Sequence, residues 1–181
     1  MTEKLQYQVV HYPEPVLRKR AEEVPEVDDA VRDTVAAMFQ TMYEDKGVGL
    51  AAPQVGLRIR ILVLNQTGDP EEKAEELALV NPTLVDRGGP ATRMDEGCLS
   101  FPGIYAEVER PDRCTVRYLD LEGNQVEREF EGFPSRIVQH EYDHLEGVLL
   151  VDRMSPAEKV RNKAALEELV DDYKRRRGSK R

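Results

Sequence analysis

The chain has 181 residues, of which 40% are hydrophobic, and this is enough for one domain with a sizeable core. Its formal net charge of -9 argues against a general nucleic-acid binder, and we expect no specific binding to DNA. The sequence contains no recognisable signal peptide or long apolar span, so we expect a cytoplasmic protein that does not bind membranes.

The first predicted element is a helix that Asp28 or Asp29 can cap and that Gly47 ends. A stripe of apolar residues at helical spacing assigns one face of this helix to the core: Val31, Val35, Met38 and Met42. The next segment, residues 47–56, is a loop of small residues whose backbone could hydrogen-bond an extended ligand. Within it, Gln54 is either an ordinary polar loop residue or a neutral donor for an oxyanion.

Alternating and β-branched runs predict strands over residues 59–64, 77–80, 113–119 and 125–131, the last two joined by a turn at Gly123 and Asn124. The acidic segment 68–76 is expected to be a solvated loop. Cys114 lies in a predicted strand and is typical of a small core residue. Cys98 lies beside Gly97, which leaves the backbone free to bring a thiolate to a metal. A disulfide between the two cysteines is not expected, because cytosolic thiols stay reduced.

The most informative segment is Gln-His-Glu-Tyr-Asp-His at 139–144, within a helix predicted over residues 133–145. His140 and His144 are one helical turn apart and can bind one divalent cation, while Glu141 can take a proton from water. This arrangement indicates hydrolysis by an activated water. Leu150 occupies the position where a metzincin carries its third histidine, so that class is excluded.

A catalytic metal usually has three protein ligands and one open position. The candidates for the third ligand are Glu158, Glu167, His11 and the two cysteines, and Cys98 is the best of them.

The last helix has Ser155 as its cap, Pro156 at its first position and Glu158 completing a capping box. Residues 156–181 form a basic C-terminal helix and tail, and a basic end suits the negative terminus of a helix.

These elements predict an α+β fold with a metal-binding helix set among small, mostly antiparallel sheets, together with an N-terminal and a C-terminal helix. Residues 47–54 (Gly-Val-Gly-Leu-Ala-Ala-Pro-Gln), 96–100 (Glu-Gly-Cys-Leu-Ser) and 139–145 (Gln-His-Glu-Tyr-Asp-His-Leu) match the three signature motifs of the peptide deformylase family, in that family's order. The chain therefore resembles that family, from about His11 to Met154. The resemblance implies that residues 1–181 form a single catalytic domain. Tyr105 stands where some relatives carry an arginine that holds the substrate backbone, and this departure removes the basis for expecting that contact.

The resemblance implies a hydrolase of protein biosynthesis that removes the formyl group from the N-formylmethionine of nascent chains and releases formate. It implies one divalent metal held by Cys98, His140 and His144. In this family the metal is usually ferrous iron, while zinc, nickel or cobalt can replace it; ligand softness alone favours zinc. The expected nucleophile is water activated by the metal, with Glu141 as general acid and base. Gln54 and the backbone N–H of Leu99 are expected to stabilise the oxyanion.

The resemblance also implies that the backbone of Val48, Gly49 and Gly97 pairs with an extended substrate. We expect an apolar pocket for the methionine side chain, lined by Val48, Met94, Phe133 and Ile137. The family further suggests that the basic end of the last helix docks on the ribosome through Lys174, Arg175, Arg176 and Arg177. Two other functions are weighed against this one: a zinc metallopeptidase of the His-Glu-x-x-His type, and an inactive nascent-chain binder associated with the ribosome.

Overall fold

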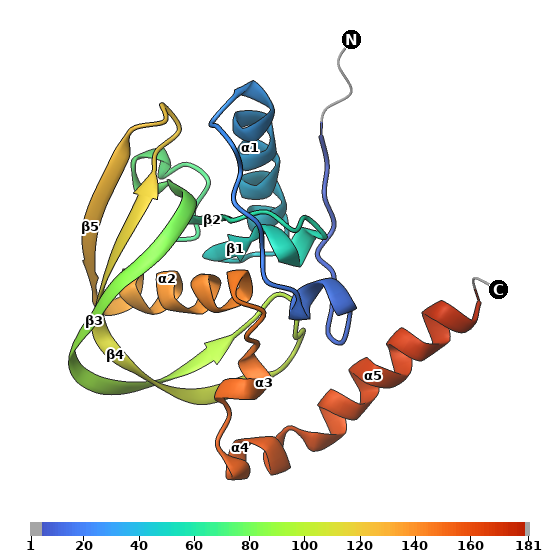
Figure 1. Cartoon of the computed structure of the whole chain (residues 1–181). Coiled ribbons are helices and arrows are strands. Elements are labelled where there is room, and N and C mark those ends of the chain that lie inside the picture. Colours follow the sequence, from blue (N-terminus) through green and yellow to red (C-terminus); the bar gives the residue numbers. More distant parts are fainter. Residues whose placement is uncertain (1–4, 180–181) are drawn as a thin grey trace.

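In the computed structural model, which describes residues 5–179, one antiparallel sheet and a central helix form the middle of the molecule (Figure 1). The strands follow one another in the sheet in chain order: β1 (Gly49–Ala51), β2 (Ile61–Leu64), β3 (Leu77–Gly97), β4 (Tyr105–Leu119) and β5 (Gln125–Glu131). The α-helices are α1 (Asp29–Glu44), α2 (Gly132–Leu145), α3 (Leu150–Arg153), α4 (Pro156–Arg161) and α5 (Lys163–Gly178). Short 3-10 helices are η1 (Pro15–Arg18), η2 (Ala52–Val55) and η3 (Lys73–Glu75). The expected α+β class is confirmed.

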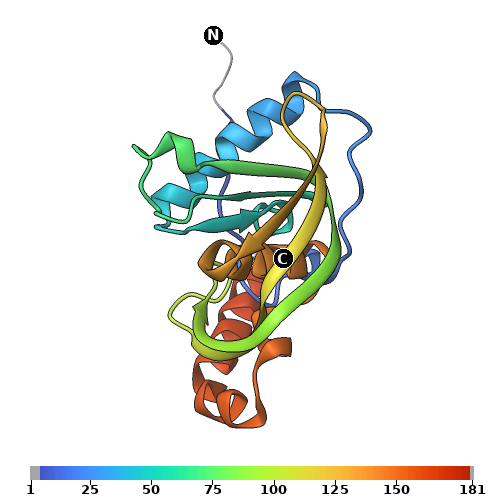
Figure 2. The same cartoon turned by 90° about the vertical axis from the view of Figure 1, so that its left-hand side faces the viewer.

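The strands β3 and β4 form a long ribbon that curves around α2, as the two views at right angles show (Figures 1 and 2). Both strands are longer than the predicted runs 77–80 and 113–119, and their pairing extends to Gly97 and Tyr105. Asn81-Pro82 and Gly88-Gly89-Pro90 would ordinarily interrupt a strand. Here the register shifts between Val80 and Thr83 and between Gly88 and Ala91, so the strand continues through irregularities that bend it.

Asp28 caps α1, since its side chain accepts a hydrogen bond from the Val31 N–H at 2.9 Å. The predicted apolar stripe of this helix is buried in a cluster with β1 and β2. The end of the helix differs from the expectation that Gly47 ends it: α1 stops at Glu44, and the left-handed residue that follows is Lys46, at φ 59°. Gly47 itself is closely packed, because a Cβ there would lie 2.7 Å from Cδ1 of Leu99.

Helix α2 confirms the element predicted over 133–145 and is buried along most of its length. Its apolar residues Ile137, Val138 and Leu145 pack into a core cluster with β2, β3, β4 and β5. A helix enclosed in this way can hold polar side chains in fixed positions, because core side chains have little freedom to move.

The predicted last helix is divided in two. Ser155 caps α4 by accepting from the Glu158 N–H, as expected, but the helix ends at Arg161 and α5 begins at Lys163. Between them, the side-chain amide of Asn162 donates to the carbonyl of Tyr105 at 3.1 Å and to that of Glu158 at 3.0 Å. The break between α4 and α5 therefore coincides with a contact to β4, and no glycine or proline in the sequence predicts it.

Lys180 and Arg181 of the predicted basic tail lie outside the described residues. No helix of the described part is long and apolar enough to span a membrane.

Candidate metal centre

Helix α2 and the chain after β3 bring three potential ligands together. The ring centroids of His140 and His144 are 5.2 Å apart, and Sγ of Cys98 is 3.3 Å from Nε2 of His144. One donor atom from each of these residues lies within 4.8 Å of the others. His11 lines the same cavity, but within residues 5–179 it does not join this group, and neither do Glu158 and Glu167.

Cys98 reaches the site because β3 ends immediately before it. The chain turns there, with the carbonyl of Cys98 accepting from the Phe101 N–H at 2.9 Å. Cys114 is elsewhere, buried in β4, where Oγ of Ser135 donates to its sulfur at 3.4 Å. Both cysteines are free, so the expected absence of a disulfide and the core position of Cys114 agree with the structure.

A buried carboxylate, which the sequence analysis missed, orients one of the rings. Oε2 of Glu96 accepts from Nδ1 of His140 at 2.9 Å, which leaves Nε2 of that ring for the site. Arg110 donates to both oxygens of Glu96, at 2.6 and 3.0 Å, and Arg136 donates to Oε1 at 3.1 Å. Burial by itself raises the pKa of Glu96, but hydrogen bonds from His140 and Arg110 outweigh it and hold that pKa well below its usual range.

Asp143, the residue before His144 in α2, belongs to the same charged cluster. Asp143 accepts from Arg110 at 2.9 Å and from Arg153 at 2.7 and 2.9 Å. Among these arginines, only the position of Arg136 near the site could be predicted from the sequence, because it precedes His140 by one helical turn. Arg110 and Glu96 are 14 residues apart and meet only through the pairing of β3 with β4.

The two imidazoles differ electrostatically. Burial lowers the pKa of His140, but contacts with the Cys98 sulfur and Glu96 reverse this and raise it well above 6.5. Burial and the neighbouring His140 charge lower the pKa of His144 well below 6.5. In the metal-free site, the Cys98 sulfur and Glu96 therefore favour the protonated form of His140, and burial favours the neutral form of His144.

Glu141 is a buried carboxylate next to His140 in the sequence. It is 5% exposed, and its Oε2 has no hydrogen-bond partner among the described residues. Burial raises the pKa of Glu141 to about 7, where a carboxyl group can both take up and release a proton near neutrality. Gly49 borders it so closely that a Cβ would lie 2.7 Å from Oε1 of Glu141 and 2.7 Å from Cγ2 of Ile137.

Gln54 reaches the site from η2. Its Oε1 accepts from the Ala51 N–H at 2.9 Å, and this fixes the orientation of the amide. Its Nε2 donates to Oγ of Ser100 at 3.2 Å and lies 3.5 Å from Sγ of Cys98. The amide nitrogen therefore points at the ligand cluster, as the interpretation of Gln54 as an oxyanion donor requires.

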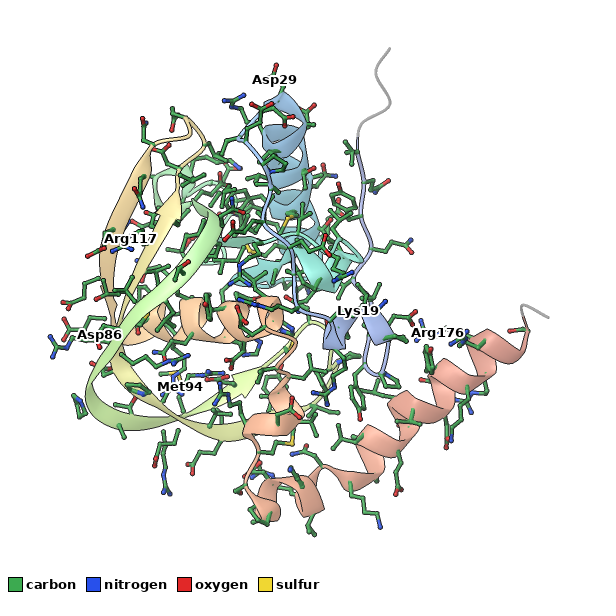
Figure 3. The ribbon with its side chains drawn as sticks, in the orientation of Figure 1. Lys19, Asp29, Asp86, Met94, Arg117 and Arg176 are labelled. Carbon is green, nitrogen blue, oxygen red and sulfur yellow. The ribbon has the colours of Figure 1, made fainter. Side chains whose placement is uncertain are left out.

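A cavity of about 640 Å³ opens beside this cluster. All the residues that we predicted to contact substrate line it: Val48, Gly49, Met94, Gly97, Phe133 and Ile137. Met94 and Phe133 are 40% and 42% exposed and therefore lie at its rim, whereas Ile137 is 4% exposed. In Figure 3 Met94 lies between the curved ribbon and α2, while Asp86 lies at the outer edge of the ribbon.

The chain is similar to known proteins over most of its length. A family model described as polypeptide deformylase matches residues 6–160. A protein named peptide deformylase from Thermotoga neapolitana is 45% identical over 154 residues, which are 85% of this chain and 90% of that protein. The crystal structure of a plant peptide deformylase superposes with a TM-score of 0.93 at 40% identity, covering 98% of this chain and 96% of that one. A peptide deformylase structure from Plasmodium falciparum gives a TM-score of 0.89 at 43% identity, covering 92% and 96%.

Proposed function

The chain belongs to the peptide deformylase family of enzymes, which remove the N-formyl group from nascent peptides, and we propose that it does so with a divalent metal held by Cys98, His140 and His144. The observation that carries the proposal is the convergence of these three donors within 4.8 Å beside Glu141, whose Oε2 has no hydrogen-bond partner in the described part of the chain. We further propose that residues 1–181 act as one catalytic domain.

The residues fit such an ion. One sulfur and two imidazole nitrogens are a donor set for borderline metals, and the Glu96 contact supplies the outer hydrogen bond that metal-bound histidines usually have. The resident ion that we propose is ferrous iron, on family grounds, with zinc, nickel and cobalt able to take its place. When bound, the ion acts as a Lewis acid that makes water more acidic and polarises a carbonyl group.

The residues of the chain then have distinct tasks. Glu141 takes the proton of the attacking water at its Oε2 and passes it to the departing amine. Nε2 of Gln54 and the backbone N–H of Leu99 donate to the oxyanion. Because Nε2 has two protons and two present neighbours, Ser100 and Cys98, it must give up one of these contacts to do so.

The substrate is an extended N-formylmethionyl peptide that lies between two strand segments. β1 is at the edge of the sheet, and the end of β3 pairs on one side with Tyr105 of β4. The backbone near Val48, Gly49 and Gly97 can therefore accept an added strand. The methionine side chain enters the cavity beside Ile137, with Met94 and Phe133 at the rim.

Product analysis on matched peptides separates this function from the two alternatives. We expect formyl-Met-Ala-Ser to yield equal amounts of formate and free amine, and acetyl-Met-Ala-Ser to yield far less product. Cleavage of internal peptide bonds without formate would indicate a metallopeptidase. Binding without turnover, in a chain with full metal content, would indicate an inactive nascent-chain binder.

We also propose that the basic end of α5 contacts the ribosome in the cytoplasm. Lys174 and Arg175 are already paired within the helix, with Asp171 and Asp172, and Arg177 donates to Tyr173. Arg176 lies near the end of α5 (Figure 3). Removing residues from Lys174 onward should reduce co-sedimentation with ribosomes at low salt. A Lys163→Ser variant at the start of α5 serves as a control, and unaltered association of the truncated chain would reject the proposal.

A further inference from the structure

Asn65 is a completely buried residue at the end of β2, and its polar groups are all engaged. The side chain is 0% exposed. Its Oδ1 accepts from the N–H and the hydroxyl of Thr67, at 3.0 and 2.7 Å. Its Nδ2 donates to the carbonyls of Asp69 and Glu72, at 3.1 and 3.2 Å. A buried amide with this many partners holds one orientation, because turning it would leave buried polar groups unsatisfied.

These hydrogen bonds fold the acidic segment that we expected to be a solvated loop. The segment turns back on itself at Gly68, whose N–H donates to the Asn65 carbonyl at 3.1 Å. Gly68 has φ 67°, and a Cβ there would lie 3.4 Å from Cγ1 of Val48. Asp69, Glu71 and Glu72 remain exposed to solvent, whereas Glu76 is partly buried, and Gly68 places the backbone of this segment against Val48, the residue before β1.

Asn65 also joins this segment to α1. Nδ2 of Asn65 has two protons for three acceptors, so it shares them among the Asp69 and Glu72 carbonyls and the Tyr43 hydroxyl, which lies 2.9 Å away; that hydroxyl donates to Glu76 at 2.8 Å. Burial raises the pKa of Tyr43 to about 12, so the hydroxyl keeps its proton at any physiological pH. Three separate parts of the chain therefore meet at one amide.

The backbone of Asn65 is hydrogen-bonded to Val48, one of the residues that we propose to pair with the substrate. Its N–H donates to the carbonyl of Val48 at 2.9 Å, and this bond extends the pairing of β1 with β2 by one residue beyond Gly49 and Leu64. Val48 and Gly49 line the cavity, and no strand of the described chain covers their other side. The three residues of β1 are buried and paired with β2, whereas Val48 precedes the strand and is held at its carbonyl by Asn65.

We propose that Asn65 is a positioning residue, which holds the Val48–Gly49 backbone in the extended form that the substrate backbone must pair with. This inference rests on the proposed function of the cavity. Asn65 touches neither the reacting atoms nor the ligand cluster, so its contribution is to substrate binding: an edge fixed beforehand loses less conformational freedom when a peptide pairs with it.

The test compares KM and kcat of an Asn65→Ala variant on two substrates. With formyl-Met-Ala-Ser, whose backbone can pair along the edge, we expect KM to rise about tenfold while kcat changes less than about twofold. With formyl-methionine, which has no following peptide bond, KM should stay near the wild-type value. A Gln66→Ala variant is the matched control, because Gln66 is exposed and its side chain donates, within residues 5–179, to Glu75 alone.

A purely structural role would raise KM for both substrates alike or lower kcat, and either result would overturn the proposal. If Asn65→Ala does not fold, Tyr43→Phe is the second variant, because it removes one hydrogen bond of Asn65 and keeps the aromatic ring. It should show a smaller rise in KM with formyl-Met-Ala-Ser and no rise with formyl-methionine. Amide hydrogen exchange at Val48 and Gly49 gives a readout without turnover. Exchange should be faster in the Asn65 variant, and unchanged exchange there would refute the positioning role even if the deformylase function holds.

Discussion

At the scale of single residues, the environment of each carboxylate determines its task. Glu141 is buried, its Oε2 has no hydrogen-bond partner within residues 5–179, and burial raises its pKa to about 7. Glu96 is buried among cations that hold its pKa well below its usual range. The first is suited to moving protons and the second to remaining charged. The sequence predicted the role of Glu141 from its place between two histidines. It did not predict that of Glu96, because its partners come from β4 and α2.

Replacing Glu141 with alanine or glutamine should remove the base and leave the metal ligands in place. We expect a full metal content with turnover reduced by roughly 10²-fold or more. Metal analysis and steady-state kinetics on the same sample check this, with Glu131→Gln, an exposed carboxylate at the end of β5, as a control. Wild-type turnover in the Glu141 variants would remove this residue from the mechanism.

Glu96→Gln should weaken metal binding, because the amide is a poorer acceptor for the Nδ1 proton of His140 and removes one of the two carboxylates paired with Arg110. Loss of such outer hydrogen bonds typically costs about 10- to 100-fold in metal affinity. Competition with a chelator measures this, and Glu107→Gln tests the loss of an exposed carboxylate of the β3–β4 ribbon. Equal affinities of all three proteins would show that Glu96 does not orient His140.

At the scale of elements, the site depends on how closely β1 approaches α2. The predicted helix 133–145 and the predicted N-cap at Asp28 were confirmed, since helical spacing and caps are local features. The strand β1 was expected to be loop, and β3 was expected to be short. Both depend on pairing with distant strands, and register shifts let β3 continue through Asn81-Pro82. The break at Asn162 likewise depends on Tyr105, which is remote in sequence.

Gly49→Ala tests this close approach. The new methyl group would lie 2.7 Å from both Glu141 and Ile137, so the strand or the carboxylate must move. We expect the variant to fold, with a loss of about 1–3 kcal/mol in stability, and kcat/KM to fall by about 10- to 100-fold. Gly88→Ala is the matched control, because its methyl group would meet only Arg113, at 3.9 Å. A similar kcat/KM in both variants would contradict the packing argument.

At the scale of the whole molecule, a buried ionic network joins the ribbon to α2. Glu96 and Asp143 meet Arg110, Arg136 and Arg153 in the region between these elements. Composition and periodicity predicted an α+β protein with a helix among strands, and that arrangement is confirmed. They could not predict this network, because its members are scattered over 58 positions from Glu96 to Arg153 and no local pattern connects them.

The network predicts how stability depends on pH. The pKa of Glu96 is lower in the folded chain than its usual 4.5, so its charge stabilises the fold above about pH 4.5 and this contribution is lost as the pH falls below that value. Denaturant unfolding of the metal-free protein should therefore show a steep acid decline that is shallower in Glu96→Gln. Glu107→Gln should keep the wild-type dependence, and an unchanged slope in Glu96→Gln would contradict the assignment.

The central claim is that Cys98, His140 and His144 together hold the ion on which deformylation depends. It is tested most directly by adding ferrous iron in steps to the metal-free protein without oxygen, while bound metal and formate release from formyl-Met-Ala-Ser are measured on the same samples. We predict that formate release rises in proportion to bound metal and stops rising at one ion per chain, and that Cys98→Ala and His144→Ala show neither strong binding nor release. Full formate release by the metal-free protein, or by either variant, would contradict the claim.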